Sequence, residues 1–309
     1  MSGLFVIILL IVPLVLGVLA ATTSFGIAKL EAEHPPTGQF VEVQGVQLHV
    51  ADLGFARDAP EAEPAVVLIH GASGNLEDMR LAVGERLAST HRVILIDRPG
   101  HGWSSRPESD DYASPARQAE LVVGALEQLR VRRAILIGHS WDGAFATTFA
   151  LAFPKRTAGL VLLVAVTHPW AANPGWYNKV AALPFIGPVF LRTCVYPLGL
   201  LLTQGATRSV FEPQSVPADY VRRVAIRLVL RPKSFYSNAR DLALLRSFIT
   251  DQVPRYAELR TTTVIITGDR DTIVSPDINA RALAATLPRA KLVLLKEWDT
   301  CRTTPLSIS

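Results

Sequence analysis

The feature that most constrains the fold is a series of short apolar runs, each bounded by turn residues. They cover residues 65–69, 92–96, 134–137, 159–166, 263–267 and 291–295. A strand that is covered by helices on both faces is apolar along its whole length, whereas a half-exposed strand alternates between apolar and polar residues. The runs therefore predict the strands of a parallel sheet.

Helical patterns and one hairpin complete the expected architecture. Apolar side chains recur at helical spacing over residues 114–130, 142–153 and 277–287, between the apolar runs. Residues 40–43 and 46–52 alternate around Gly45, which is typical of an antiparallel hairpin. This order predicts an α/β fold with a doubly wound, mostly parallel sheet. The core is expected over residues 40–167 and 261–296, with the hairpin at one edge of the sheet.

The alternation stops between residues 168 and 260. This stretch has no strand-like run and is rich in Trp, Pro, Leu and Tyr. We predict a helical cap, inserted between two strands and lying over the carboxyl edge of the sheet, where it would cover a pocket. In an alternative interpretation, its apolar residues only form a core for the insertion itself.

The first 25 residues form a separate segment. Residues 4–21 are apolar and are broken only by Pro13 and Gly17. As a helix they span about 27 Å, close to the hydrocarbon thickness of a bilayer. We predict a single-pass transmembrane anchor over residues 1–25, with a lipid contact through residues 4–21, and a linker over residues 26–39. The alternative is a cleaved signal peptide and a secreted or periplasmic protein, but the long apolar run and the lack of a basic start favour the anchor.

Charge and cysteine content exclude several classes of function. The 31 basic and 27 acidic residues give a net charge of +4 without a basic run, so we expect no nucleic-acid partner. The two cysteines, Cys194 and Cys301, cannot form a disulfide framework or a zinc site. We expect no metal and no organic cofactor, and the oligomeric state stays open.

A candidate nucleophile follows the run at residues 134–137. The chain there reads Gly138-His139-Ser140-Trp141-Asp142-Gly143 and continues into a helical pattern. A Ser on a sharp strand-to-helix turn presents its Oγ outward, and small residues on either side allow the turn to close. Ser140 is therefore our candidate nucleophile. The alternative is an ordinary helix N-cap, a position that Ser favours.

Together with three further motifs in order, this turn resembles that of the α/β-hydrolase superfamily, and the resemblance covers roughly residues 40–296. It is closest to membrane-anchored bacterial members with a helical cap. The other motifs are His70-Gly71-Ala72-Ser73-Gly74, residues 97–104 with the pattern D-x-P-G-x-G-x-S, and Gly268-Asp269-Arg270-Asp271. The resemblance implies that the N–H groups of Ala72 and Trp141 form the oxyanion hole, and that Asp271 rather than Asp269 is the triad acid.

The resemblance also implies an activity. A Ser at position 140, where dehalogenases and epoxide hydrolases of this fold carry Asp, favours hydrolysis of a carboxylic ester or related acyl bond through an acyl-enzyme. An esterase- or lipase-like enzyme with a small hydrophobic acyl substrate is expected. The alternatives are haloperoxidase or C–C hydrolase chemistry, or an inactive member of the fold. Residues of the motifs and the pocket would be His70, Gly71, Ser73, Gly138, His139 and Trp103.

The C-terminal segment departs from the family pattern. The triad His should come just after residues 291–295, but no histidine follows Asp271. Trp298 has the single codon TGG and Asp299 begins with GA, so a frame that starts at the last base of Trp298 encodes Gly and then His or Tyr. We hypothesise a frameshift near Lys296, which would make residues 297–309 an aberrant tail. A truncated product or a pseudoenzyme is the alternative.

A second departure is Asp142, which stands where the pattern G-x-S-x-G has its last Gly. A side chain there would strain the turn, and its negative charge would oppose an oxyanion near Ser140. Alternatively, the carboxylate would hydrogen-bond the helix N-terminus and be tolerated.

Overall fold

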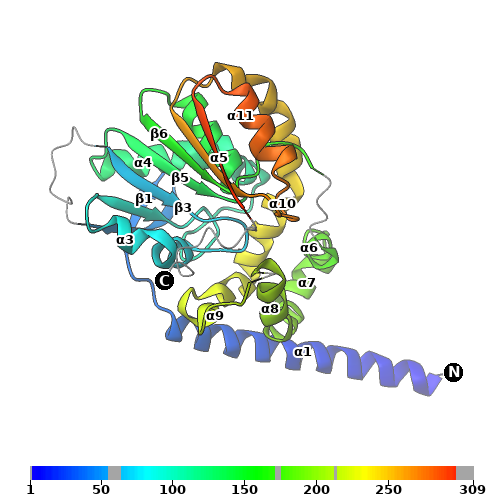
Figure 1. The fold of residues 1–309 in the computed structure, drawn as a ribbon. Coiled ribbons are helices and arrows are strands. Elements are labelled where there is room, and N and C mark those ends of the chain that lie inside the picture. Colours follow the sequence, from blue (N-terminus) through cyan, green and yellow to red (C-terminus); the bar gives the residue numbers. More distant parts are fainter. Residues whose placement is uncertain (1, 55–63, 171–174, 212–213, 297–309) are drawn as a thin grey trace.

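A computed structural model describes residues 2–54, 64–170, 175–211 and 214–296, with side chains from residue 10 onward. The protein has an α/β fold, as expected, with an eight-stranded sheet between layers of helices (Figure 1). The tail at residues 297–309, including the expected position of the triad His, lies outside the described residues.

Every apolar run of the sequence forms a strand, and the expected hairpin forms the first two strands. The strands are β1 (Gln39–Val43), β2 (Val46–Leu53), β3 (Ala65–Ile69), β4 (Val93–Ile96), β5 (Ala134–His139), β6 (Thr157–Leu163), β7 (Thr263–Gly268) and β8 (Ala290–Leu295). Their order in the sheet is β1-β2-β4-β3-β5-β6-β7-β8. β2 pairs antiparallel with β1 and β4, and all other pairs are parallel. The carboxyl ends of β3, β5 and β7 therefore meet at one edge, where the motifs lie.

The core helices cover the two faces of the sheet. They are α2 (Leu76–Met79), η1 (Arg80–Gly84), α3 (Glu85–Leu87), η2 (Asp110–Ala113), α4 (Pro115–Gln128), α5 (Asp142–Ala152), η5 (Asp277–Arg281) and α11 (Ala282–Thr286). α4 starts at Pro115, a residue that suits a first helical turn because its missing N–H would have no partner there. α5 is buried along most of its length, with Phe145 and Phe149 in the main core.

The stretch between β6 and β7 is an insertion made of helices. Within its described residues it contains α6 (Trp176–Ala181), α7 (Ile186–Thr193), α8 (Val195–Phe211), α9 (Tyr220–Arg223), η3 (Ile226–Leu230), α10 (Pro232–Gln252) and η4 (Val253–Glu258). It has a small apolar core of its own, which includes Leu191, Tyr196 and Phe235. Other apolar side chains of the insertion are exposed, for example Phe185 and Leu201.

The N-terminal helix is longer than expected. α1 (Ser2–Glu33) continues through the region where we predicted a linker from residue 26, so that boundary is wrong as far as Glu33. The reason is tertiary, because Ile27 and Leu30 pack against the core of the insertion and keep the chain helical. Residues Leu10–Glu33 form a helix that is long and apolar enough to cross a membrane, a property that a signal sequence shares. Figure 1 shows α1 running past the insertion and projecting beyond the body.

Candidate active site

Ser140 lies on a strained turn between β5 and α5. Its φ is 54°, in the left-handed region that non-glycine residues rarely adopt. The turn is held by its backbone: the Ser140 N–H donates to the Leu163 carbonyl (3.0 Å), and the Ser140 carbonyl accepts from Val166 N–H (2.9 Å) and Gly143 N–H (3.0 Å). The side chain is half-buried. This is the local geometry of a nucleophile elbow.

The turn requires small neighbours. A Cβ at Gly138 would lie 2.9 Å from the Asp142 carbonyl oxygen, and a Cβ at Gly143 would lie 2.5 Å from the Ala165 Cβ. These distances are shorter than van der Waals contact, so the glycines allow β5, α5 and the segment after β6 to approach one another.

The loop after β3 lies directly against this turn. A side chain at Gly71 would come within 3.0 Å of Ser140 Cβ and 3.1 Å of the His139 carbonyl oxygen. Within the described part of the chain, no backbone hydrogen bond takes up the N–H of Ala72 or of Trp141. Both N–H groups therefore remain available in the two segments that the family motif pairs as an oxyanion hole.

His70 is a structural residue in this arrangement. Its Nδ1–H donates to the Gly71 carbonyl (2.8 Å), and its Nε2 accepts from the Arg98 N–H (3.1 Å). Burial, together with the neighbouring Arg98 guanidinium, lowers the pKa of His70 to about 3. The ring is neutral at physiological pH, and both of its nitrogens are already engaged, so it cannot act as the base for Ser140.

Asp271 lies in the turn after β7, two strands away from Ser140 in the sheet order. Its carboxyl is buried, and Oδ1 accepts hydrogen bonds from the N–H groups of Ile273 (2.9 Å) and Val274 (2.7 Å). These two hydrogen bonds fix the orientation of the carboxyl group. Asp271 thus lies at the carboxyl edge of the sheet, at the end of the strand where the family motif has its acid.

The histidine that follows β6 lies at the same edge of the sheet. His168 is half-buried, and its Nδ1 lies 3.0 Å from Thr167 Oγ1. Its ring is tilted against the ring of Tyr256, with the centroids 5.5 Å apart. Burial lowers the pKa of His168. These contacts anchor the start of the insertion and do not direct the ring to a carboxylate.

The environment of Asp142 differs from both predictions made from the sequence, which were a charge that opposes an oxyanion and a hydrogen bond to the helix N-terminus. Its side chain is fully buried, and neither carboxyl oxygen has a hydrogen-bond partner among the described residues, so it does not cap the helix N-terminus. Burial raises the pKa of Asp142 well above the usual range of an Asp, an effect that nearby Arg98 only partly offsets. Burial thus favours the neutral form of this carboxyl, which weakens the charge repulsion that we expected near Ser140.

The insertion supplies two residues that the sequence analysis missed. Asn238 on α10 is buried, and its Oδ1 accepts a 2.7 Å hydrogen bond from the N–H of Ser73, which has a φ of 58°. Asp241, one turn later, accepts from Arg98 Nη1 and from Arg106 Nη1, both at 2.6 Å. The available signal was two polar residues three apart, on one face of a helical pattern, because polar groups need partners where that face is buried.

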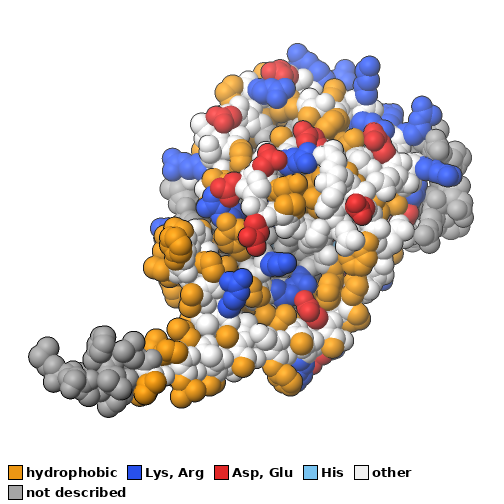
Figure 2. Space-filling model, turned by 180° about the vertical axis from the view of Figure 1, so that it is seen from behind, with side chains coloured by type: hydrophobic (Ala, Val, Ile, Leu, Met, Phe, Trp, Pro, Cys, Tyr) orange, Lys and Arg blue, Asp and Glu red, His pale blue; other side chains and the backbone are white. Residues whose placement is uncertain are grey.

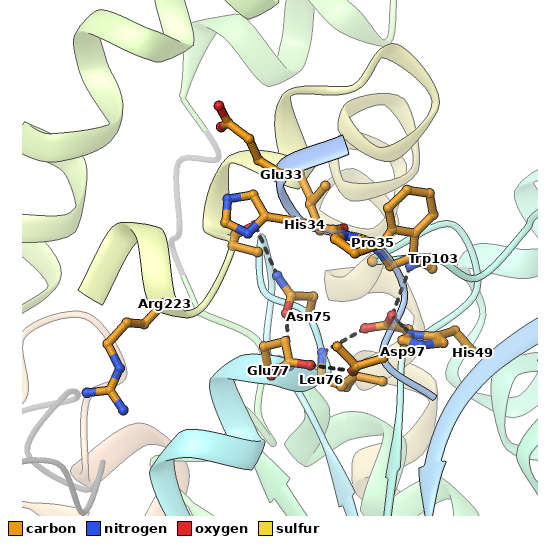
Figure 3. A pocket seen from close by; sticks show the side chains of 14 residues that line it. Glu33, His34, Pro35, His49, Asn75, Leu76, Glu77, Asp97, Trp103 and Arg223 are labelled. Carbon is orange, nitrogen blue, oxygen red and sulfur yellow. Dashed lines mark hydrogen bonds and ion pairs between the residues drawn. The ribbon is translucent and has the colours of Figure 1, made fainter. Parts of the chain in front are cut away.

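Trp103, predicted as a pocket residue, lines a pocket that does not include Ser140. A pocket of about 200 Å³ lies between the end of α1, the start of α2 and the insertion, and Glu33, His34, Asn75 and Trp103 contribute to it (Figure 3). Ser140 and Asp271 do not line it.

Beneath this pocket, Asp97 organises the loop that carries Trp103. Its Oδ2 accepts from His49 Nδ1 (2.7 Å) and from the Trp103 N–H (2.9 Å), and its Oδ1 accepts from the Leu76 N–H (2.7 Å). Figure 3 shows these groups converging on the carboxylate. With its acceptors taken up in this way, Asp97 has a structural role. No cluster of His, Cys, Asp or Glu suited to a metal ion occurs among the described residues.

Several bacterial hydrolases are similar to this chain in sequence. A 2-hydroxy-6-oxononadienedioate/2-hydroxy-6-oxononatrienedioate hydrolase of Cupriavidus pinatubonensis is 26% identical over 269 residues, which is 83% of this chain and 86% of the relative. A 2-hydroxymuconate semialdehyde hydrolase of Pseudomonas putida is 32% identical over 144 residues, but the match covers only 46% of this chain and 48% of that protein.

The solved structures give the same fold. A membrane phospholipase A, described as a bacterial virulence factor, superimposes with a TM-score of 0.62 at 19% identity and covers 99% of this chain and 93% of its own. The family described as the alpha/beta hydrolase fold matches residues 64–299. With this match and the strand order above, the chain belongs to the α/β-hydrolase family, whose members include hydrolytic enzymes.

Proposed function

We propose that the protein is a serine hydrolase that cleaves a carboxylic ester or a related acyl bond. The observation that carries this proposal is the left-handed turn at Ser140, closed against Gly71 of the loop after β3. Ser140 Oγ attacks the carbonyl carbon, and the N–H groups of Ala72 and Trp141 stabilise the oxyanion. Collapse of the resulting tetrahedral intermediate releases the alcohol and leaves an acyl-enzyme, which water hydrolyses.

The general base is the unassigned part of this mechanism. In this mechanism Asp271 orients a histidine, but no histidine follows it in the sequence. Loss of the base from a triad typically lowers kcat by about 10⁴–10⁶. We therefore expect weak turnover for this sequence, and the frameshift near Lys296 remains our hypothesis for the missing group.

A fluorophosphonate probe tests the nucleophile, because it reacts with an activated serine. We expect labelling of the full chain that disappears in Ser140→Ala and persists in Ser89→Ala, a control at an exposed serine. A second preparation, translated in the shifted frame after residue 296, should be labelled faster. If neither preparation reacts, or if labelling survives Ser140→Ala, the proposal is wrong.

Hydrolysis of a carbon–carbon bond is a second candidate. It is favoured by the relative from Cupriavidus pinatubonensis, whose name describes a hydrolase of an oxo-dienedioate and whose match spans most of both chains. Parallel assays with p-nitrophenyl esters of different chain length and with a vinylogous 1,5-diketone acid separate the two. If only the diketone were hydrolysed, the ester proposal would be wrong and carbon–carbon hydrolysis would take its place.

We further propose that α1 anchors the protein in a membrane. Its exposed apolar side chains include Leu10 (68% exposed), Leu14 (66%) and Val18 (58%), which would be unfavourable in water. Flotation of the full chain with lipid vesicles, and its retention there after an alkaline carbonate wash, tests this. Recovery of a shortened, soluble chain from the producing cells would support signal cleavage instead.

A further inference from the structure

The insertion presents a second apolar surface next to α1. We name the apolar elbow as the following exposed side chains at and around helices α7 and α8: Leu183 (46%), Phe185 (89%), Ile186 (60%), Val189 (48%), Leu201 (79%) and Leu202 (54%). The two helices meet at a bend of 66°. Large apolar side chains exposed to this degree within a short stretch mark a site of interaction with a protein or a membrane.

The conformation at the start of α7 keeps this surface outward. Phe185 has a φ of 62°, which is strained for a bulky residue, and its ring is nevertheless almost completely exposed. Folding alone gains nothing from this arrangement, because the ring is not buried in the apolar core of the insertion.

The opposite faces of α7 and α8 are packed into the protein. Leu191, Val195 and Tyr196 are buried in the core of the insertion. A helix that crosses a bilayer away from the protein is apolar all round, whereas a helix that lies in the interface has one apolar outer face. The two helices therefore suit an interfacial position and not a span.

The two helices that carry the apolar elbow pack against α1 through their buried residues. Thr23 Oγ1 donates to the Thr193 carbonyl (3.5 Å), and Gly26 lies so close to the Tyr196 ring that a Cβ would overlap it. Figure 1 shows α7 and α8 alongside α1, and Figure 2 shows hydrophobic side chains along α1 and on the adjoining flank of the body. The membrane that receives the first part of α1 therefore lies near the elbow.

The charged residues of the segment that carries the elbow are all basic. Residues 168–211 contain Lys179, Arg192 and Arg208 and no acidic residue. Interfacial helices combine an apolar face with Lys and Arg, which interact with anionic lipid headgroups. This pattern favours a lipid surface over a second copy of the chain, where these cations would meet one another across a symmetric interface.

We propose that the apolar elbow inserts into the interfacial region of the same bilayer that receives α1. The inference rests on the anchor proposed above. The protein is then held at two points, and the insertion faces the membrane. A hydrophobic acyl substrate could pass from the lipid to the insertion without crossing water.

Site-specific quenching in vesicles tests the contact. In the full chain with Cys194→Ser and Cys301→Ser, the environment-sensitive dye NBD is attached at Leu201→Cys in the elbow. The matched control is Ile278→Cys, an exposed apolar residue in η5, which directly precedes α11 on the side of the molecule away from α1 (Figure 1). Vesicles of phosphatidylglycerol and phosphatidylcholine carry doxyl groups on the acyl chains.

We expect the dye at position 201 to shift to the blue and lose about half of its emission to the doxyl lipids, and the dye at position 278 to remain unchanged. Flotation of the same samples reports on α1 independently. A chain that floats but shows no quenching at position 201 would retain the anchor and overturn the elbow contact. A blue shift without lipid quenching would show that a second copy covers the surface, and a chain that does not float would overturn both proposals.

Discussion

Arg98 Nη1 lies 2.6 Å from Asp241 Oδ2, and both side chains are almost completely buried. Arg98 follows β4 in the core, and Asp241 belongs to α10 in the insertion, 143 residues later. The Arg98 guanidinium also lies 3.9 Å from the ring centroid of Trp141, next to Ser140. This ion pair thus connects the insertion to the turn that carries the candidate nucleophile.

Removal of Asp241 should destabilise the whole protein. Asp241→Ala leaves the buried guanidinium groups of Arg98 and Arg106 without their carboxylate, and we expect the free energy of unfolding to fall by about 3–5 kcal/mol. Urea unfolding of the full chain measures this. The control is Asp110→Ala, which breaks the more exposed pair with Arg240 and should cost no more than about 1 kcal/mol. Equal losses in the two variants would contradict the buried network.

Asn238 should position the oxyanion loop. Asn238→Ala removes the acceptor for the Ser73 N–H, and because Ser73 holds a strained φ next to Ala72, we expect the loop to relax. Small displacements of catalytic groups are costly, so labelling of Ser140 by the fluorophosphonate should slow by about tenfold or more. Arg240→Ala, on the same helix, is the control and should label at the parent rate. An unchanged rate in Asn238→Ala would show that the loop needs no support from the insertion.

Asp142 should make stability fall as pH rises. Because folding raises the pKa of Asp142, the folded protein keeps a proton that the unfolded chain releases above a pH of about 4. The free energy of unfolding therefore decreases between that pH and the pKa of the folded state. Asp142→Asn should be more stable than the parent at pH 7 and lose this advantage at pH 3.

Denaturant unfolding over this pH range gives the comparison for Asp142. Asp251→Asn, at an exposed position, should run parallel to the parent throughout. A constant difference between Asp142→Asn and the parent at every pH would mean that the carboxyl does not change its protonation on folding.

His70 should make the protein sensitive to acid. Its pKa falls from an ordinary value of 6.5 to about 3 on folding, so in this range the unfolded chain binds a proton that the folded protein does not. The part of the free energy of unfolding that depends on this shift is fully present above pH 6.5. It is lost toward pH 3, by about 1.4 kcal/mol per pH unit. His70→Asn should reduce the slope of stability against pH, while exposed His91→Asn should leave it unchanged. If both variants had the same slope of stability against pH as the parent, the assignment of this acid sensitivity to His70 would be wrong.

The local elements of this protein could be predicted from the sequence because their signals are local. Continuous apolarity at residues 65–69 or 263–267 predicts a buried strand, and the observed strands begin at the same residues. The turn around Ser140 was found in the same way, since a Ser between a buried strand and a helix, with Gly138 two residues before it, is a pattern within a few residues. The expectation for the linker after residue 25 failed because the outcome depends on the packing of Leu30 against a segment more than 150 residues away.

The contacts between segments that are distant in the sequence were decided only by the tertiary structure. Asn238 and Asp241 reach the loop after β3 and Arg98 across more than 140 residues, and a helical pattern alone says nothing about which loop a buried polar side chain meets. The raised pKa of Asp142 follows from complete burial, which depends on what packs over it. The sequence by itself thus determined the strands and the helices between them, because backbone conformation responds to neighbouring residues. Solvent exclusion and pairing across the fold decided their environments.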